Sequence, residues 1–133
     1  MKIAICGSVA FAREMFETKD KLEVLGHEVT IPKNIKKYAD GTSGEEDKWE
    51  KVEMDVFKVY FEKIKANDSI LVLNYDKNDV PNYIGGNSLI EIAFAHILNK
   101  KIFLLNPVPS MSYTDEVEAM KPIVLDGSLE KIK

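Results

Sequence analysis

The chain has 133 residues, 45% of them hydrophobic and 30% charged, and a formal net charge of −4 at pH 7. This composition is that of a globular protein with one sizeable core, so we expect a single domain over residues 1–133. The interspersed lysines and glutamates form no basic stripe, and no run approaches the roughly 18 apolar residues of a membrane span, so neither a nucleic-acid polymer nor a membrane is an expected partner.

The beginning of the chain predicts a β-α-β unit. Residues 3–6 form a short apolar run that Gly7-Ser8 closes, which is typical of a buried strand and its turn. Apolar residues at helical spacing follow from residue 11 to 25, and Gly26 is a suitable C-terminal stop. Residues 27–31 predict a second strand, and the length of the unit fits a parallel crossover.

The rest of the chain continues to alternate strands with helices. The polar residues 32–47 predict a loop, and residues 46–65 predict a charged amphipathic helix. A continuously apolar strand at residues 69–74 is followed by a polar loop at 75–83. The last predicted elements are a helix at 87–98, a strand at 101–105, a short helix at 113–120 and an edge strand at 122–125.

This alternation predicts an α/β fold, a three-layer sandwich around a doubly wound, five-stranded parallel sheet. For five strands the flavodoxin-like order 2-1-3-4-5 is the common solution. Ligands of such sheets bind beyond the carboxyl ends of the strands, where the strand order reverses. We therefore expect a crevice formed by Gly7-Ser8, the loop at residues 75–87 and Asn106.

The segment from residue 82 to 96 carries the strongest functional signal. Gly85-Gly86 opens the predicted helix, and Glu91 lies in its predicted first turn ahead of an apolar run. Glycines allow a backbone to approach a ligand closely, and a helix start attracts anions and favours an ionised carboxylate. These residues predict a small-molecule site with one reactive acid. A structural interpretation is the commoner one for such residues, because Ser88 and Glu91 also match a capping box, and the two are compatible if the Glu91 side chain can leave the cap.

Other kinds of site find little support in the sequence. His27 and His96 are isolated and belong to no metal-ligand pattern, so we expect no metal. The dinucleotide and Walker glycine patterns are absent, so we expect no cofactor. Cys6 is the single cysteine; we interpret it as a small buried residue, and we expect a reducing, cytoplasmic location.

Several segments together resemble a known family. They are Cys6-Gly7-Ser8 after the first strand, residues 67–73 leading into the third, Glu91-Ile92-Ala93-Phe94-Ala95, and residues 99–105. The chain resembles the nucleoside 2-deoxyribosyltransferase superfamily, which includes deoxynucleoside 5′-monophosphate N-glycosidases, over nearly its whole length.

The resemblance implies a reaction and a set of site residues. Glu91 would attack C1′ of a (deoxy)nucleoside or its 5′-monophosphate, expel the base, and pass the sugar to another base or to water. Gly7 and Ser8, together with the loop Gly85-Gly86-Asn87-Ser88, would bind the sugar or phosphate. The resemblance also implies a homo-oligomer, and the region from residue 113 to 123 is a candidate for its interface.

The chain departs from the family pattern at three positions. Ala4 occupies the place of a tyrosine that orients the nucleophile, Tyr60 that of a second acid, and Gly85 that of an acid or serine. Candidates to assist the departing base are Tyr75, Asp76 and Tyr83, whereas Asp68 is interpreted as the residue that introduces the third strand.

These departures leave two other functions open. One is a nucleotide or nucleotide-sugar sensor on the same fold, without catalysis. The other is an interaction module resembling flavodoxin or a response-regulator receiver, although an acidic cluster at the strand ends is not visible in the sequence.

Overall fold

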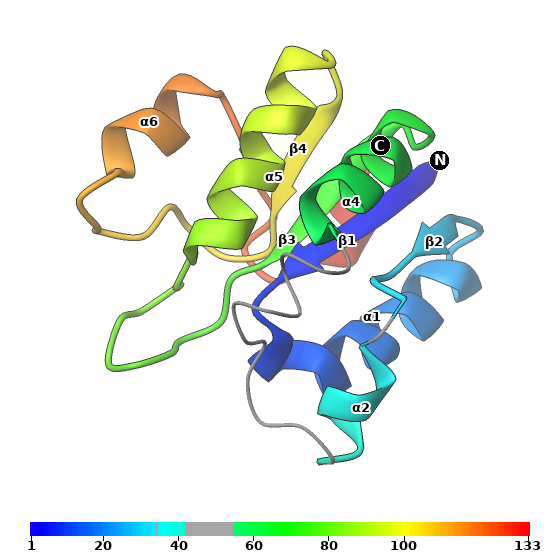
Figure 1. Ribbon diagram of the computed structural model, residues 1–133. Coiled ribbons are helices and arrows are strands. Elements are labelled where there is room, and N and C mark those ends of the chain that lie inside the picture. The colour runs from blue at the N-terminus through cyan, green and yellow to red at the C-terminus, as the bar shows by residue number, and fades with distance from the viewer. Residues whose placement is uncertain (34, 42–54) are drawn as a thin grey trace.

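The computed structural model describes residues 1–33, 35–41 and 55–133. Five parallel strands form one sheet in the order β2-β1-β3-β4-β5 (Figure 1). The strands are β1 (Lys2–Gly7), β2 (Glu28–Thr30), β3 (Ser69–Leu73), β4 (Lys101–Leu104) and β5 (Ile123–Val124). The described helices are α1 (Ala12–Val24), α2 (Lys36–Ala39), α4 (Val56–Lys65), α5 (Gly86–Ile97), α6 (Thr114–Ala119), and the 3₁₀ helices η1 (Val9–Phe11) and η2 (Leu129–Lys131).

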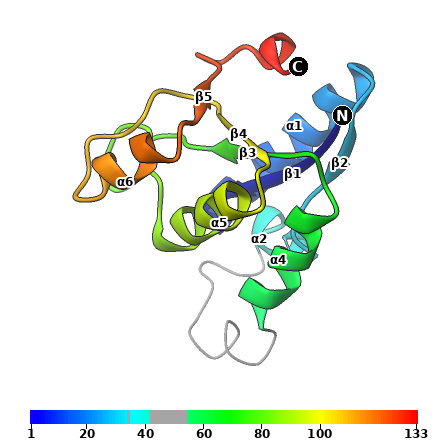
Figure 2. The same cartoon turned by 90° about the horizontal axis from the view of Figure 1, so that it is seen from above.

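The elements stack in three layers. Figure 2 shows α1 and the C-terminal segment on one side of the sheet, and α4 and α5 side by side on the other. The predicted flavodoxin-like α/β sandwich and its strand order 2-1-3-4-5 are therefore confirmed. Each apolar run became a central strand because both faces of a parallel sheet are covered by helices.

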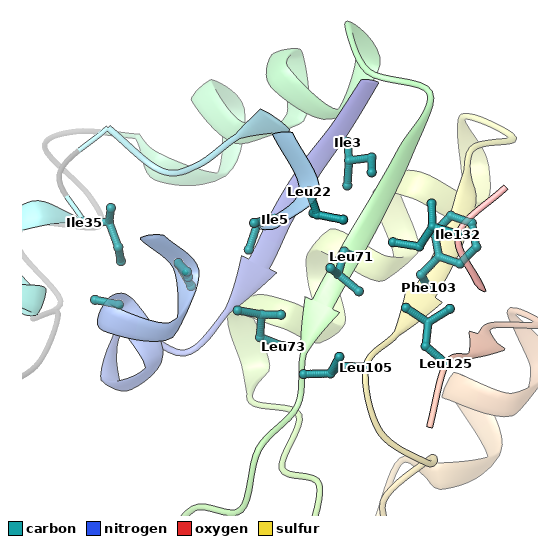
Figure 3. Close-up of a cluster of buried hydrophobic side chains, with 12 residues drawn as sticks. Ile3, Ile5, Leu22, Ile35, Leu71, Leu73, Phe103, Leu105, Leu125 and Ile132 are labelled. Carbon is teal, nitrogen blue, oxygen red and sulfur yellow. The ribbon is translucent and has the colours of Figure 1, made fainter. Parts of the chain in front are cut away.

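Successive residues of each central strand point to opposite faces of the sheet. Ile3 and Ile5 of β1 and Leu71 and Leu73 of β3 pack against Leu22 of α1 (Figure 3). We call this side, which also buries Phe103 and Leu125, the α1 face.

The strand residues that alternate with those of the α1 face point to the opposite face of the sheet. Ala4 and Cys6 of β1 and Val72 of β3 pack against Ile64 of α4 and Ile92 of α5. We call this side the α5 face. Val117, in the region suggested for oligomer contacts, is fully buried in this core, whereas Ile123 is 45% exposed.

Two predicted boundaries change in the structure. The described part of the predicted loop 32–47 contains α2, whose Tyr38 and Ala39 pack against the core of the α1 face. This short helix was not predicted, because its lysine-rich sequence resembles that of a polar loop. Of the helix predicted at 46–65, α4 accounts for residues 56–65, and the beginning of the prediction lies outside the described residues.

The start of α5 corrects the capping-box interpretation. The N-cap is Gly85, no side chain caps the helix, and the first helical bond runs from Leu89 N to Gly85 O at 2.9 Å. Ser88 is therefore the third helical residue and Glu91 the sixth, so Glu91 is not in the first turn. The approach at the cap is close, because a Cβ at Gly85 would lie 3.1 Å from Cε1 of Tyr83, so a larger residue there would have to displace that ring by a few tenths of an ångström.

Candidate active site

A cavity of about 470 Å³ lies beyond the carboxyl ends of β1, β2 and β3, between α4 and the start of α5. Its volume falls in the range of small-molecule sites, roughly 300–1,000 Å³. All the site residues predicted from the sequence are among those that line it, namely Gly7, Ser8, Gly85, Gly86, Asn87, Ser88 and Glu91. The fold thus gathers the segments after β1 and β3 as expected at a point where strand order reverses.

Glu91 lies above the end of β1 and contacts Cys6. Cys6 is 1% exposed on the α5 face, and its thiol and the Glu91 carboxylate form a side-chain hydrogen bond. Burial raises the pKa of the Cys6 thiol well above its ordinary value of 9.0, and the charge of Glu91 and this bond raise it further. Cys6 is therefore a protonated donor to Glu91 at neutral pH, and its thiol is not a nucleophile there.

Tyr60 of α4 completes this buried group. Its hydroxyl donates a hydrogen bond to the carbonyl of Ile5, and only 4% of the residue is exposed. Burial raises the pKa of Tyr60 well above 10.0, with further contributions from Cys6 and Glu91. Tyr60 also lines the cavity. Here it supplies a neutral phenol.

The side of the cavity next to β3 is rich in hydrogen-bond donors. Lys77 Nζ lies 2.9 Å from Ser8 Oγ, which also accepts from the Ala10 amide at 3.2 Å. The same ammonium lies 5.4 Å from the ring centroid of Tyr83. Ser88, 2% exposed, lines the cavity from the first turn of α5. A cation, a hydroxyl and a helix start together suit an anionic group.

The side of the cavity next to β2 holds a second pair of cations. Lys33 follows β2, and Lys63 belongs to α4, one turn beyond Tyr60. Burial lowers the pKa of Lys63, and the nearby positive charge of Lys33 lowers it further. Neither lysine forms an ion pair with any residue in the described part of the chain.

Of the three loop residues proposed to assist the departing base, Tyr83 lines the cavity. Tyr75 instead packs edge-on against Phe11, with ring centroids 5.3 Å apart, at the core of the α1 face. Asp76 accepts a hydrogen bond from the Asn82 amide at 3.0 Å and is exposed. These two side chains stabilise the loop and lie outside the cavity lining.

Asn106, also expected at the crevice, pairs instead with Asn74 at the end of β3. The Asn106 amide donates to Asn74 Oδ1 at 2.9 Å, and Asn74 Nδ2 donates to the Asn106 carbonyl at 2.9 Å. Asp68 accepts from the Lys2 amide at 2.8 Å, consistent with its interpretation as a residue that introduces β3. Ala4 is fully buried within the sheet.

Three cavity lysines, Lys33, Lys63 and Lys77, were not identified from the sequence. They come from a β2 loop, a helix and a β3 loop, and no spacing connects them. The sequence signal available was weak: an isolated lysine directly after a predicted strand, as at Lys33, faces the ligand edge of an α/β sheet.

The described residues contain neither a candidate metal cluster nor a candidate membrane-spanning helix. Residues 1–33, 35–41 and 55–133 contain no cluster of three His, Cys, Asp or Glu side chains that could hold a metal ion. In the same ranges no helix has the length and apolar character needed to cross a membrane.

Comparisons with known proteins identify no relative. No family profile, no curated protein and no solved structure matches this chain significantly. The resemblance to the nucleoside 2-deoxyribosyltransferase superfamily therefore depends on the sequence segments described above alone.

Proposed function

We propose that this protein cleaves or transfers the N-glycosidic bond of a (deoxy)nucleoside or its 5′-monophosphate, with Glu91 as the nucleophile. The observation that carries the proposal is the position of Glu91, which lines the cavity while Cys6 donates a hydrogen bond to its carboxylate from below. A carboxylate held in this way is oriented for attack on a ligand in the cavity.

The reaction has two steps. A carboxylate oxygen of Glu91 forms a bond to C1′ as the C1′–N bond breaks, and the electron pair of that bond leaves with the base, which takes up a proton. A water molecule, or a nitrogen of a second base, then attacks C1′ and releases Glu91, so the configuration at C1′ is retained. The Lys77–Ser8 pair beside the start of α5 supports a phosphate-bearing substrate.

Release of free base tests this function. The four deoxynucleosides and their 5′-monophosphates are incubated with the purified protein, and free base is measured by chromatography. Glu91→Gln keeps the shape of the side chain but removes the nucleophile, so it should lower the rate at least about a thousandfold.

The matched control is Glu62→Gln, on an exposed position of α4 that does not line the described cavity. It should release base at the wild-type rate. Absence of base release by the wild-type protein, or an undiminished rate in Glu91→Gln, would contradict the assignment.

Nucleotide binding without turnover is the second candidate function. It is favoured by Tyr60, because the position of the family's second acid holds a hydroxyl that already donates to the Ile5 carbonyl. Thermal unfolding with the same nucleotides distinguishes the two functions. A sensor is stabilised by a nucleotide, by about 2.7 kcal/mol at a ligand concentration 100 times Kd, and releases no base.

A further inference from the structure

The cavity extends to both sides of the end of β1. In the sheet order β2-β1-β3, Lys33 follows β2 and Lys77 lies in the loop after β3. Two strand spacings separate β2 from β3, about 10 Å. Glu91 contacts Cys6 of β1 and so lies between the two sides. A ligand whose reacting carbon lies at Glu91 would extend one end toward each group of lysines.

The two sides differ in chemistry. Near β3, Lys77, Ser8 and the start of α5 provide donors for an anion. Near β2, the wall combines apolar side chains of the β2 loop and α4, among them Pro32, Ile35 and Phe57, with Lys33 and Lys63. An apolar wall with a few donors suits a planar heterocycle. On the proposed function, phosphate then lies near β3 and the base near β2.

Lys63 is the lysine of the β2 side that α4 places next to Tyr60 in the cavity wall. It follows Tyr60 by three residues on α4, and residues at this spacing share a helix face, with Cβ atoms about 5–6 Å apart. Tyr60 lies close enough to Glu91 for the carboxylate charge to raise its pKa. The wall therefore runs from Glu91 past Tyr60 to Lys63.

A departing base needs a proton, and the described cavity offers few donors for it. Tyr60, at the family's second-acid position, is bound to the Ile5 carbonyl. The titratable groups that line the cavity are Lys33, Tyr38, Tyr60, Lys63, Lys77, Tyr83 and Glu91. Lys63 is half-buried, and burial together with Lys33 lowers its pKa. A general acid works best when its pKa is close to the working pH.

We propose that Lys63, beside Lys33 at the β2 side of the cavity, is the general acid that protonates the departing base. This inference rests on the proposed function. As C1′–N breaks, the electron pair goes to the base nitrogen, which takes a proton from the Lys63 ammonium. When water then attacks C1′ of the sugar ester on Glu91, its proton returns to the neutral Lys63 amine, and both side chains regain their initial state.

Dependence on the leaving group tests this role. Lys63→Met is assayed with deoxynucleoside 5′-monophosphates and with 4-nitrophenyl 2-deoxyriboside, whose phenolate leaves without needing a proton. Loss of a general acid should lower kcat for base release about 10²–10⁴-fold. The rate for the nitrophenyl substrate should fall less than about threefold, because the same nucleophilic attack remains.

Lys63→Arg separates proton donation from charge. A guanidinium keeps the positive charge but does not give up its proton near neutral pH, so this variant should be as slow as Lys63→Met on the monophosphates. If Lys63 is the acid, kcat of the wild type should fall at alkaline pH as its ammonium loses the proton, and this fall should be absent from both variants. Lys58→Met, on the exposed side of α4 where Lys58 pairs with Asp55, is the matched control and should keep wild-type rates.

Each result bears on the inference. A large loss on monophosphates with a small loss on the nitrophenyl substrate supports it. Equal losses on both substrates, or recovery of activity in Lys63→Arg, overturn Lys63 as the acid and leave Glu91 as the nucleophile. No release of base or nitrophenolate by the wild type overturns the proposed function and this inference with it.

Discussion

The two faces of the central sheet differ most at β1, although the same strands supply both. The α1 face is filled by large aliphatic and aromatic side chains such as Ile3, Leu71 and Phe103. On the α5 face, β1 contributes the smaller Ala4 and Cys6. These small residues leave space beneath α4 and α5, and the side chains of Tyr60 and Glu91 lie near Cys6 there.

Several polar groups of the candidate site reach it from the α5 side. Tyr60, Ser88 and Glu91 come from α4 and α5, and Cys6 donates to Glu91 from the sheet. Changes in the strand residues of the α1 face should therefore alter stability alone, whereas changes in the strand residues of the α5 face should alter stability and reaction together. The following predictions test that division.

The largest effect is expected from neighbouring residues of β3 that point to opposite faces. Leu71→Ala should lower the free energy of unfolding by about 2–5 kcal/mol, because Leu71 is fully buried on the α1 face. Its kcat, measured at a temperature where the variant is folded, should stay within about twofold of the wild type.

Val72→Ala is the matched change on the α5 face. It removes fewer methylene groups and should cost roughly 1–3 kcal/mol. Val72 lies beside Cys6 in the strand register, so the loss of packing should also lower kcat. Urea unfolding and base-release assays measure both quantities. Equal effects of the two variants on kcat would show that the two faces do not differ in their influence on the reaction.

Alkaline pH should weaken the α5 face. The fold raises the pKa of Cys6 above 9.0 and that of Tyr60 above 10.0, so above these values the folded chain keeps protons that the unfolded chain loses. The stability contribution is therefore complete below pH 9 and falls as pH rises, by about 1.4 kcal/mol per pH unit for each proton.

Tyr60→Phe should flatten this decline above pH 10, since one of the two groups is removed. The measurement is the free energy of unfolding in urea from about pH 7 to about pH 11. Tyr75 and Tyr113, whose pKa values are also raised, remain in the variant and set the residual slope. A slope identical to that of the wild type would exclude Tyr60 as a source of the decline.

A smaller effect is expected when the support of Glu91 is changed. Cys6→Ala removes the thiol that donates to the carboxylate, and the loss of such a bond should lower kcat up to about tenfold. Cys6→Ser retains a donor and should stay within about threefold of the wild type. If serine and alanine variants lose activity equally, Cys6 acts through packing alone and does not orient Glu91.

Much of the fold could be predicted from the sequence, since continuous apolar runs mark β1, β3 and β4 and a β-α-β unit fixes the direction of the first crossover. The helix predicted at 87–98 corresponds to α5, but the predicted cap at Ser88 was wrong. Ser88 is the better capping side chain, but Gly85 lies against the Tyr83 ring and begins the helix earlier.

The composition of the candidate site was predictable only in part. Gly7 ends β1 and Ser8 directly follows it, and the segment 85–91 begins the helix that follows the loop after β3, so topology alone places them at one edge of the sheet. The contacts of Cys6 with Glu91 and of Lys77 with Ser8 join residues 85 and 69 positions apart in the chain. Such pairs depend on side-chain directions in the folded sheet, which hydrophobic periodicity does not encode.

The Asn74–Asn106 pair has a consequence for how this molecule can be altered. Its two reciprocal hydrogen bonds connect the residues that follow β3 and β4, directly before the loop at residues 75–84 begins. That stretch returns alongside its own start, where the Tyr83 amide donates to the Tyr75 carbonyl at 2.9 Å. Both ends of this loop are thus held by hydrogen bonds, so replacing its tip should leave the register of β3 and β4 unchanged.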